Sequence, residues 1–134
     1  MHQETCEITT TTRCQIIDIM PQILHFLAGC APTHSGILLV NSPHTTAGLT
    51  INEKTDPHVR KDILDHMARL VPQDTGFLHV EGNSDAHIKT LLTGVSIQLP
   101  VVAGKPLLGT WQTVFFCDYD GPRKRELLLT FLHK

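Results

Sequence analysis

The sequence is poor in aromatic residues and has no marked excess of either charge. Phe, Trp and Tyr together make up 5% of the 134 residues, and the formal net charge at pH 7 is -2 with the histidines neutral. Nucleic-acid-binding surfaces usually combine a basic stripe with aromatic side chains that stack on bases. Nucleic acid is therefore not an expected partner, and the charge balance gives no reason to expect attraction to an acidic membrane surface.

The chain also lacks long hydrophobic runs and paired cysteines. No apolar stretch is long enough to span a bilayer, so no membrane partner is expected. Residues 1–5 show no basic region leading into an apolar core, which argues against a secretory signal. The four cysteines have no Cys-x-x-Cys spacing. Together these absences favour a cytoplasmic protein with reduced thiols.

What is present fits a single domain spanning residues 1–134, with 41% hydrophobic residues and enough length to bury a core. The pattern predicts an α+β fold, a mostly antiparallel sheet or sandwich with three packed helices. Helices are predicted near 18–29, 56–70 and 84–93, and strands near 6–13, 36–41, 49–52, 95–99, 113–117 and 126–132. The strand at 36–41 is expected to be buried on both faces. The last two strands are expected to pair as a hairpin through Gly121 and Pro122.

The densest group of chemically useful side chains lies between residues 78 and 87. Asn83 or Ser84 can cap a helix, which places His87 in the first turn, where free N–H groups attract anions. His79 precedes the cap, at the end of a predicted short strand. A strand end next to a helix start can point these two imidazoles at one place.

A third histidine, His44, follows the strand at 36–41 in a loop with Thr45 and Thr46. These hydroxyls can donate to a phosphate or only tie the loop to its own backbone. Three neutral imidazoles and one open position are the ligand set of catalytic zinc. We therefore predict that His44, His79 and His87 hold a divalent metal, with zinc the expected ion. The alternative is that three of the nine histidines are ordinary surface residues.

Other side chains are candidates for supporting roles. Glu53 or Asp85 can orient a histidine or take a proton from a metal-bound water. Asn83 can donate a hydrogen bond to a substrate, or only cap its helix. Trp111 can stack on a flat heterocycle, or belong to the core or to a subunit contact. Gln112 has the same two interpretations.

Four segments of the sequence, in order, resemble the YjbQ family, whose members are often labelled secondary thiamine-phosphate synthase enzymes. They are residues 44–53, Gly82-Asn83 with Ala86-His87, residues 108–112 and residues 120–123. The resemblance implies a compact α+β fold, usually seen as a homotrimer, with a histidine-bearing site. It also implies a link to making thiamine phosphate from a pyrimidine pyrophosphate and a thiazole phosphate.

Thiamine phosphate synthesis needs a different kind of site, because a pyrophosphate must leave. Magnesium, carboxylates and basic side chains commonly neutralise such a group. Arg123 can supply positive charge, whereas Lys124 and Arg125 fit a solvated charge run more simply. Magnesium prefers oxygen ligands, so three histidines suit it poorly. Magnesium would be the expected metal only if the reaction released a pyrophosphate.

The prediction is therefore a metal-dependent enzyme, a transferase or a hydrolase or lyase, acting on a small phosphorylated or heterocyclic substrate, with thiamine phosphate synthesis as a weak activity. The alternative is a non-catalytic module that binds a metabolite or phosphate and carries a structural metal.

Overall fold

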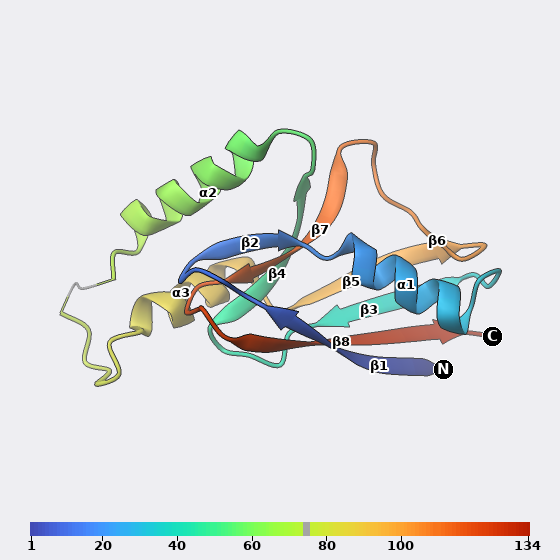
Figure 1. The fold of residues 1–134 in the computed structure, drawn as a ribbon, viewed down its shortest axis with the longest axis horizontal. Coiled ribbons are helices and arrows are strands. Elements are labelled where there is room, and N and C mark those ends of the chain that lie inside the picture. The colour runs from blue at the N-terminus through green and yellow to red at the C-terminus, as the bar shows by residue number, and fades with distance from the viewer. Residues whose placement is uncertain (74–75) are drawn as a thin grey trace.

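Two antiparallel sheets form the body of the protein (Figure 1). The computed structural model describes residues 1–73 and 76–134, and these ranges contain eight strands and three helices. The elements are β1 (His2–Thr9), β2 (Gln15–Asp18), α1 (Met20–Cys30), β3 (Gly36–Asn41), β4 (Ala47–Glu53), α2 (Pro57–Leu70), α3 (Ser84–Thr93), β5 (Ser96–Val102), β6 (Lys105–Pro106), β7 (Gln112–Asp118) and β8 (Lys124–His133). One sheet has the order β1-β8-β3-β5-β6 and the other β2-β7-β4. The predicted α+β fold is confirmed.

The core lies where the inward faces of both sheets meet α1. Successive side chains of a strand point to opposite faces, so every second residue can be buried. In β3, Leu38 and Val40 are buried, while Ile37 is 46% exposed. The expected burial of this strand on both faces is therefore wrong, because only one face of its sheet belongs to the core. Along β8, Leu127, Leu129 and Phe131 join the same cluster by the same alternation.

The last two long strands do not form the predicted hairpin. β7 pairs with β2 and β4, whereas β8 pairs with β1 and β3 in the other sheet. The connection through Gly121 and Pro122 carries the chain from one sheet to the other. Turn residues report a local change of direction and do not determine which strands pair afterwards.

The helices begin and end mostly as local sequence chemistry predicts. Asp56 caps α2 by accepting a hydrogen bond from the His58 backbone N–H at 2.9 Å, and α3 stops at Gly94.

In the described ranges, no helix has the length and apolar character needed to cross a membrane. The short strand expected just before Asn83 does not form, and His79 lies in an irregular segment.

Candidate functional site: a cleft lined by arginine and histidine

Three connecting segments meet at one end of the molecule, on the left in Figure 1. They are the loop after β3, the start of α3 and the connection from β7 to β8. Between them lies a cleft of about 320 Å³. It gathers six of the predicted site residues: His44, Thr45, Thr46, Asn83, His87 and Arg123. The fold therefore brings together side chains that are far apart in the sequence.

A close backbone contact holds the start of β4 against the end of α3. The Leu49 N–H donates to the Gly94 carbonyl oxygen at 2.9 Å. A Cβ atom on Gly48 would lie 2.5 Å from that same oxygen, so only glycine allows this approach. Ser42 closes the loop after β3, because its hydroxyl donates to the Ala47 carbonyl at 2.7 Å. The position of His44 is therefore fixed by backbone packing.

His44 is held as a neutral imidazole at the wall of the cleft. Its Nε2 atom lies 2.9 Å from the backbone nitrogen of Glu126 and 3.1 Å from the carbonyl oxygen. Burial, with a smaller contribution from the Arg125 charge, lowers the pKa of His44. In the tautomer whose Nε2 accepts from the Glu126 N–H, the ring proton is on Nδ1; in the other tautomer, Nε2–H donates to the Glu126 carbonyl. The first tautomer leaves Nδ1–H as a donor.

A buried ion pair lies beneath the cleft. Arg125, 3% exposed, donates to Asp118 through Nε at 3.1 Å and Nη2 at 2.7 Å, and Nη2 also donates to the Thr46 hydroxyl at 2.8 Å. Burial alone would raise the pKa of Asp118. Hydrogen bonds from Arg125, the Asp120 N–H and Thr10 outweigh burial and hold that pKa below its usual range. The guanidinium is therefore rigid.

Asp85 anchors α3 from inside the protein and does not face the cleft. Its two carboxylate oxygens each accept from Arg13 at 3.0 Å, and Oδ2 also accepts from Lys89 at 3.0 Å. Asp85 is 0% exposed and Lys89 3%. Burial raises the pKa of Asp85, but the bonds from Arg13 and Lys89 lower it further, so the net pKa lies below its usual range. Its position fits an anchor for the helix better than the predicted catalytic role.

Asp120 organises the polar rim. The Asn83 side chain occupies the first position before α3, but it donates to Asp120 at 2.9 Å and makes no capping bond. Arg123 donates to the Asp120 backbone oxygen at 2.9 Å and to its carboxylate at 3.2 Å. The Arg123 side chain is still 52% exposed. It therefore retains donors that can reach a ligand.

The charges around the cleft balance in number but differ in exposure. Four cations face three carboxylates in the ion pairs of this end of the molecule, which leaves one positive charge in excess: Arg13, Lys89, Arg123 and Arg125 against Asp85, Asp118 and Asp120. Glu81 lies exposed at the rim and adds one negative charge there. Arg123 combines positive charge with exposure, so it is the side chain best placed to meet an anion.

The assignment of Arg125 to a solvated charge run is wrong, because Arg125 is 3% exposed and lines the cleft. Asp120 and Glu81 were not predicted as cleft residues. The sequence does contain a pattern that predicts the direction of Arg125. Side chains alternate between the two faces of a strand, so Arg125 lies on the same face of β8 as Leu127 and Leu129 and points inward with them. Asp120 and Glu81 lie in irregular segments, where no periodic pattern predicts their direction.

The predicted three-histidine metal centre is wrong. The His79 and His87 rings are neighbours, with centroids 5.5 Å apart, but the ring nitrogen Nε2 of His44 is taken up by the Glu126 backbone. Among residues 1–73 and 76–134, no three His, Cys, Asp or Glu side chains are arranged to hold a metal ion. Neither the metal-dependent enzyme nor the structural-metal alternative has a ligand set here.

Three other predicted residues lie away from this cleft. Glu53 accepts from the backbone N–H groups of Thr55 and Asp56, at 2.9 and 2.8 Å, and so organises the turn into α2. Gln112 accepts from the Gly109 N–H at 2.8 Å. Trp111 is 62% exposed, so within a single chain it is not a core residue.

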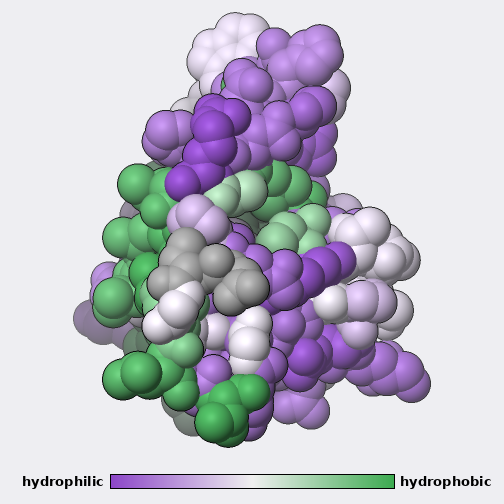
Figure 2. Space-filling model, turned by 90° about the vertical axis from the view of Figure 1, so that its left-hand side faces the viewer, coloured by the Kyte–Doolittle hydropathy of each residue, from purple (hydrophilic) through white to green (hydrophobic). Residues whose placement is uncertain are grey.

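An apolar hollow adjoins the polar cleft. It has a volume of about 420 Å³, shares His44, Thr45 and His87 with the cleft, and continues over Leu91 and Val95. His44 and His87 therefore lie at the boundary between the charged cleft and the apolar hollow. Figure 2 views this end of the molecule, where hydrophobic residues gather along one flank and hydrophilic ones along the other.

Known proteins share the fold and have similar sequences. Residues 4–134 match the family model described as UPF0047 protein YjbQ-like. The chain belongs to this family. It is 45% identical over 126 residues to UPF0047 protein MJ1081 of Methanocaldococcus jannaschii, covering 94% of this chain and 91% of that one. It is 44% identical over 130 residues to UPF0047 protein YugU of Bacillus subtilis, covering 96% and 98%.

Solved structures of YjbQ-like proteins share the fold. The hypothetical protein APE1520 of Aeropyrum pernix superposes with a TM-score of 0.94 at 32% identity, covering 100% of both chains. A YbjQ-like protein of unknown function from Sulfolobus solfataricus gives a TM-score of 0.93 at 26% identity, covering 99% and 97%. These names assign no reaction, so the predicted thiamine-phosphate synthase activity finds no support in this YjbQ-like chain's relatives.

Proposed function

We propose that this YjbQ-like protein binds a small phosphorylated molecule in the cleft between the β3–β4 loop, α3 and the β7–β8 connection. The observation that carries the proposal is the convergence of Arg123 and Arg125 on one cleft with the His44 imidazole and two threonine hydroxyls. Guanidinium groups match phosphate oxygens in geometry as well as charge. The exposure of the Arg123 guanidinium favours an anion in the same place.

Each side chain has a distinct part in this proposal. Arg125 is held rigid by Asp118 and sets the floor, while Arg123 is exposed enough to close on the anion. The Nδ1–H of His44 and the Thr45 hydroxyl donate to the remaining phosphate oxygens. The organic part of the ligand lies in the adjoining apolar hollow between His87 and Val95. This arrangement suits a phosphorylated molecule with a flat or heterocyclic body.

Phenyl phosphate is a suitable probe, because it joins a phosphate to a flat apolar ring. We expect isothermal titration calorimetry to show saturable binding that weakens as salt is added. Arg123→Gln should weaken binding about tenfold, since it removes a charge-assisted contact. Glu81→Gln should tighten it, because a repelling carboxylate is lost from the rim.

The control is Lys124→Gln, which removes an exposed positive charge next to Arg123 in sequence but outside the cleft. Its affinity for phenyl phosphate should match that of the unchanged protein. Absence of saturable binding, or equal losses in Arg123→Gln and Lys124→Gln, would contradict the proposal.

We also propose that the protein assembles as a homotrimer through the apolar flank beside the cleft. Four large hydrophobic side chains are exposed in α3 and in the segment before it: Leu78 at 98%, Val80 at 96%, Leu91 at 80% and Leu92 at 56%. Contiguous apolar surface of this kind usually marks a protein contact. The number of subunits rests on the family resemblance.

Sedimentation velocity tests the assembly. The unchanged protein should sediment with the mass of three chains, and Leu91→Glu should shift it toward one chain. Leu107→Glu is the matched control, because Leu107 is 54% exposed but lies in the segment after β6. A protein that sediments as one chain before any substitution is not the proposed trimer.

A further inference from the structure

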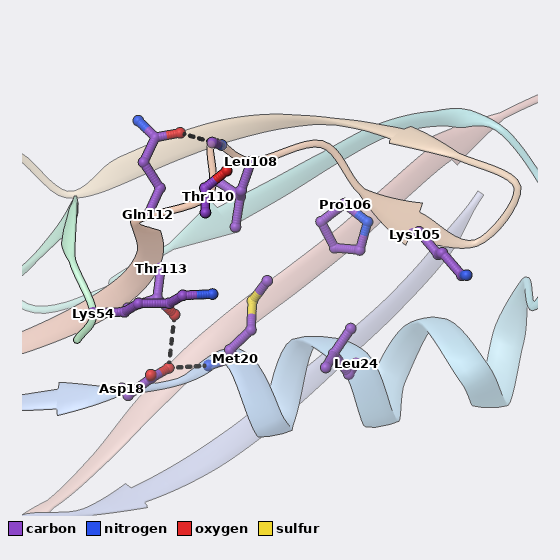
Figure 3. A pocket seen from close by; sticks show the side chains of 11 residues that line it. Asp18, Met20, Leu24, Lys54, Lys105, Pro106, Leu108, Thr110, Gln112 and Thr113 are labelled. Carbon is purple, nitrogen blue, oxygen red and sulfur yellow. Dashed lines mark hydrogen bonds between the residues drawn. The ribbon is translucent and has the colours of Figure 1, made fainter.

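A second cleft lies between α1 and the segment from β6 to β7, and it shares no lining residue with the phosphate cleft (Figure 3). Its volume is about 630 Å³. Met20 and Leu24 point from α1 toward Pro106 and Leu108 on the opposite wall. The middle of this cleft is therefore an apolar channel.

A lysine without a charge partner stands at one end of the channel. The Lys54 side chain reaches across the cleft toward Met20 (Figure 3). Its backbone N–H donates to the Trp111 carbonyl at 2.9 Å, which fixes where the side chain starts. Among the ion pairs of the described residues, Lys54 takes part in none. Its ammonium is therefore available to a ligand.

The carboxylate in this cleft is already engaged. Asp18 accepts from the Met20 N–H at 2.9 Å and from the Thr113 hydroxyl at 3.0 Å. Both bonds fall on Oδ1 and hold the carboxylate against the start of α1 and β7, and among the ion pairs of the described residues none joins Asp18 to Lys54. Lys105 also lines the cleft, but its side chain points away from Met20, so Lys54 is the lysine directed along the apolar wall (Figure 3). No arginine lines the cleft, so the planar fork that favours phosphate is missing from the lining residues of this site.

We propose that this second cleft binds an amphipathic carboxylate. Its head group pairs with the Lys54 ammonium, and its alkyl or aryl body lies along Met20, Leu24, Pro106 and Leu108. An ammonium is a compact point charge that suits a small carboxylate head group. Unbranched Met20 adapts easily to a flexible chain. The volume lies in the range of small-molecule sites.

Octanoate is the probe, and Trp111 is the reporter. Trp111 is the single tryptophan of the chain and lies next to the lining residues Thr110 and Gln112. We expect a saturable change in its fluorescence on adding octanoate. Lys54→Met should weaken octanoate binding about tenfold, because the charge-assisted contact is lost while the apolar stem remains. Lys61→Met, an exposed lysine on α2, should leave the affinity unchanged.

Two further ligands separate charge from hydrophobicity. Octanol should bind more weakly than octanoate to the unchanged protein, and acetate should not compete with octanoate. Arg123→Gln should bind octanoate normally, which distinguishes this site from the phosphate cleft. No saturable octanoate binding, equal affinity in Lys54→Met, octanol binding as tight as octanoate, or a loss in Arg123→Gln would each overturn the proposal.

Discussion

Replacing Asp85 by alanine is expected to lower the free energy of unfolding by about 3–5 kcal/mol, the usual cost of removing one partner of a buried ion pair. Asp85 is fully buried, and Lys89, which it pairs with at 3.0 Å, is 3% exposed. Without the carboxylate, the Lys89 ammonium stays buried and uncompensated. Arg13 also loses its two bonds to α3. Urea unfolding followed by circular dichroism measures the change.

The matched control for this substitution is Asp65→Ala. Asp65 pairs with Lys61 one helical turn away on α2, but both side chains are largely exposed. Exposed pairs contribute little to stability, so this variant should unfold at nearly the same urea concentration as the unchanged protein. An Asp85→Ala protein as stable as Asp65→Ala would show that Asp85 does not anchor the helix.

Arg125→Met is expected to destabilise the protein by about 3–5 kcal/mol at pH 7, and the loss should shrink in acid. In the unchanged protein the pKa of Asp118 lies below its usual range, so its contribution is present above the unfolded pKa of about 3.9 and is lost as pH falls through the folded value. Without Arg125, burial dominates and raises the pKa of Asp118. Acid then protonates the unpaired carboxylate and relieves the penalty.

Urea unfolding of both proteins at neutral pH and near pH 4 tests this linkage. Asp85 is present in both, so its titration cancels in the difference. Arg123→Met is the control, since its side chain is 52% exposed and should change stability little at either pH. A difference between Arg125→Met and the unchanged protein that grows in acid would contradict the assigned ion pair.

Local features of the fold could be predicted because neighbouring residues determine them. The Asp56-Pro57 start of α2 and the end of α3 at Gly94 follow from capping chemistry within a few residues. Pairing of β7 with β4 and of β8 with β3 depends on contacts between distant segments. β2 was not predicted, because its pairing with β7 is also a contact between distant segments. Ile16 and Ile17 lie just before the predicted helix and also fit its start.

The candidate site could be predicted in its location more than in its chemistry. The loop at 44–46 and the start of α3 do meet, as the strand and helix pattern suggested. The role of Asp85 depends on Arg13, a partner 72 residues away that no local pattern reveals. The use of His44 likewise depends on the Glu126 backbone, 82 residues along the chain. Long-range partners decide which side chains remain available.

The most direct test of the central claim is to map inorganic phosphate onto the protein by its amide chemical shifts. We expect saturable changes concentrated in residues 42–46, 81–87 and 120–126, with the remainder of the backbone unaffected. This result would place the anion between Arg123, Arg125 and His44. No saturable change, or changes concentrated at Lys54 and residues 105–113, would contradict the account.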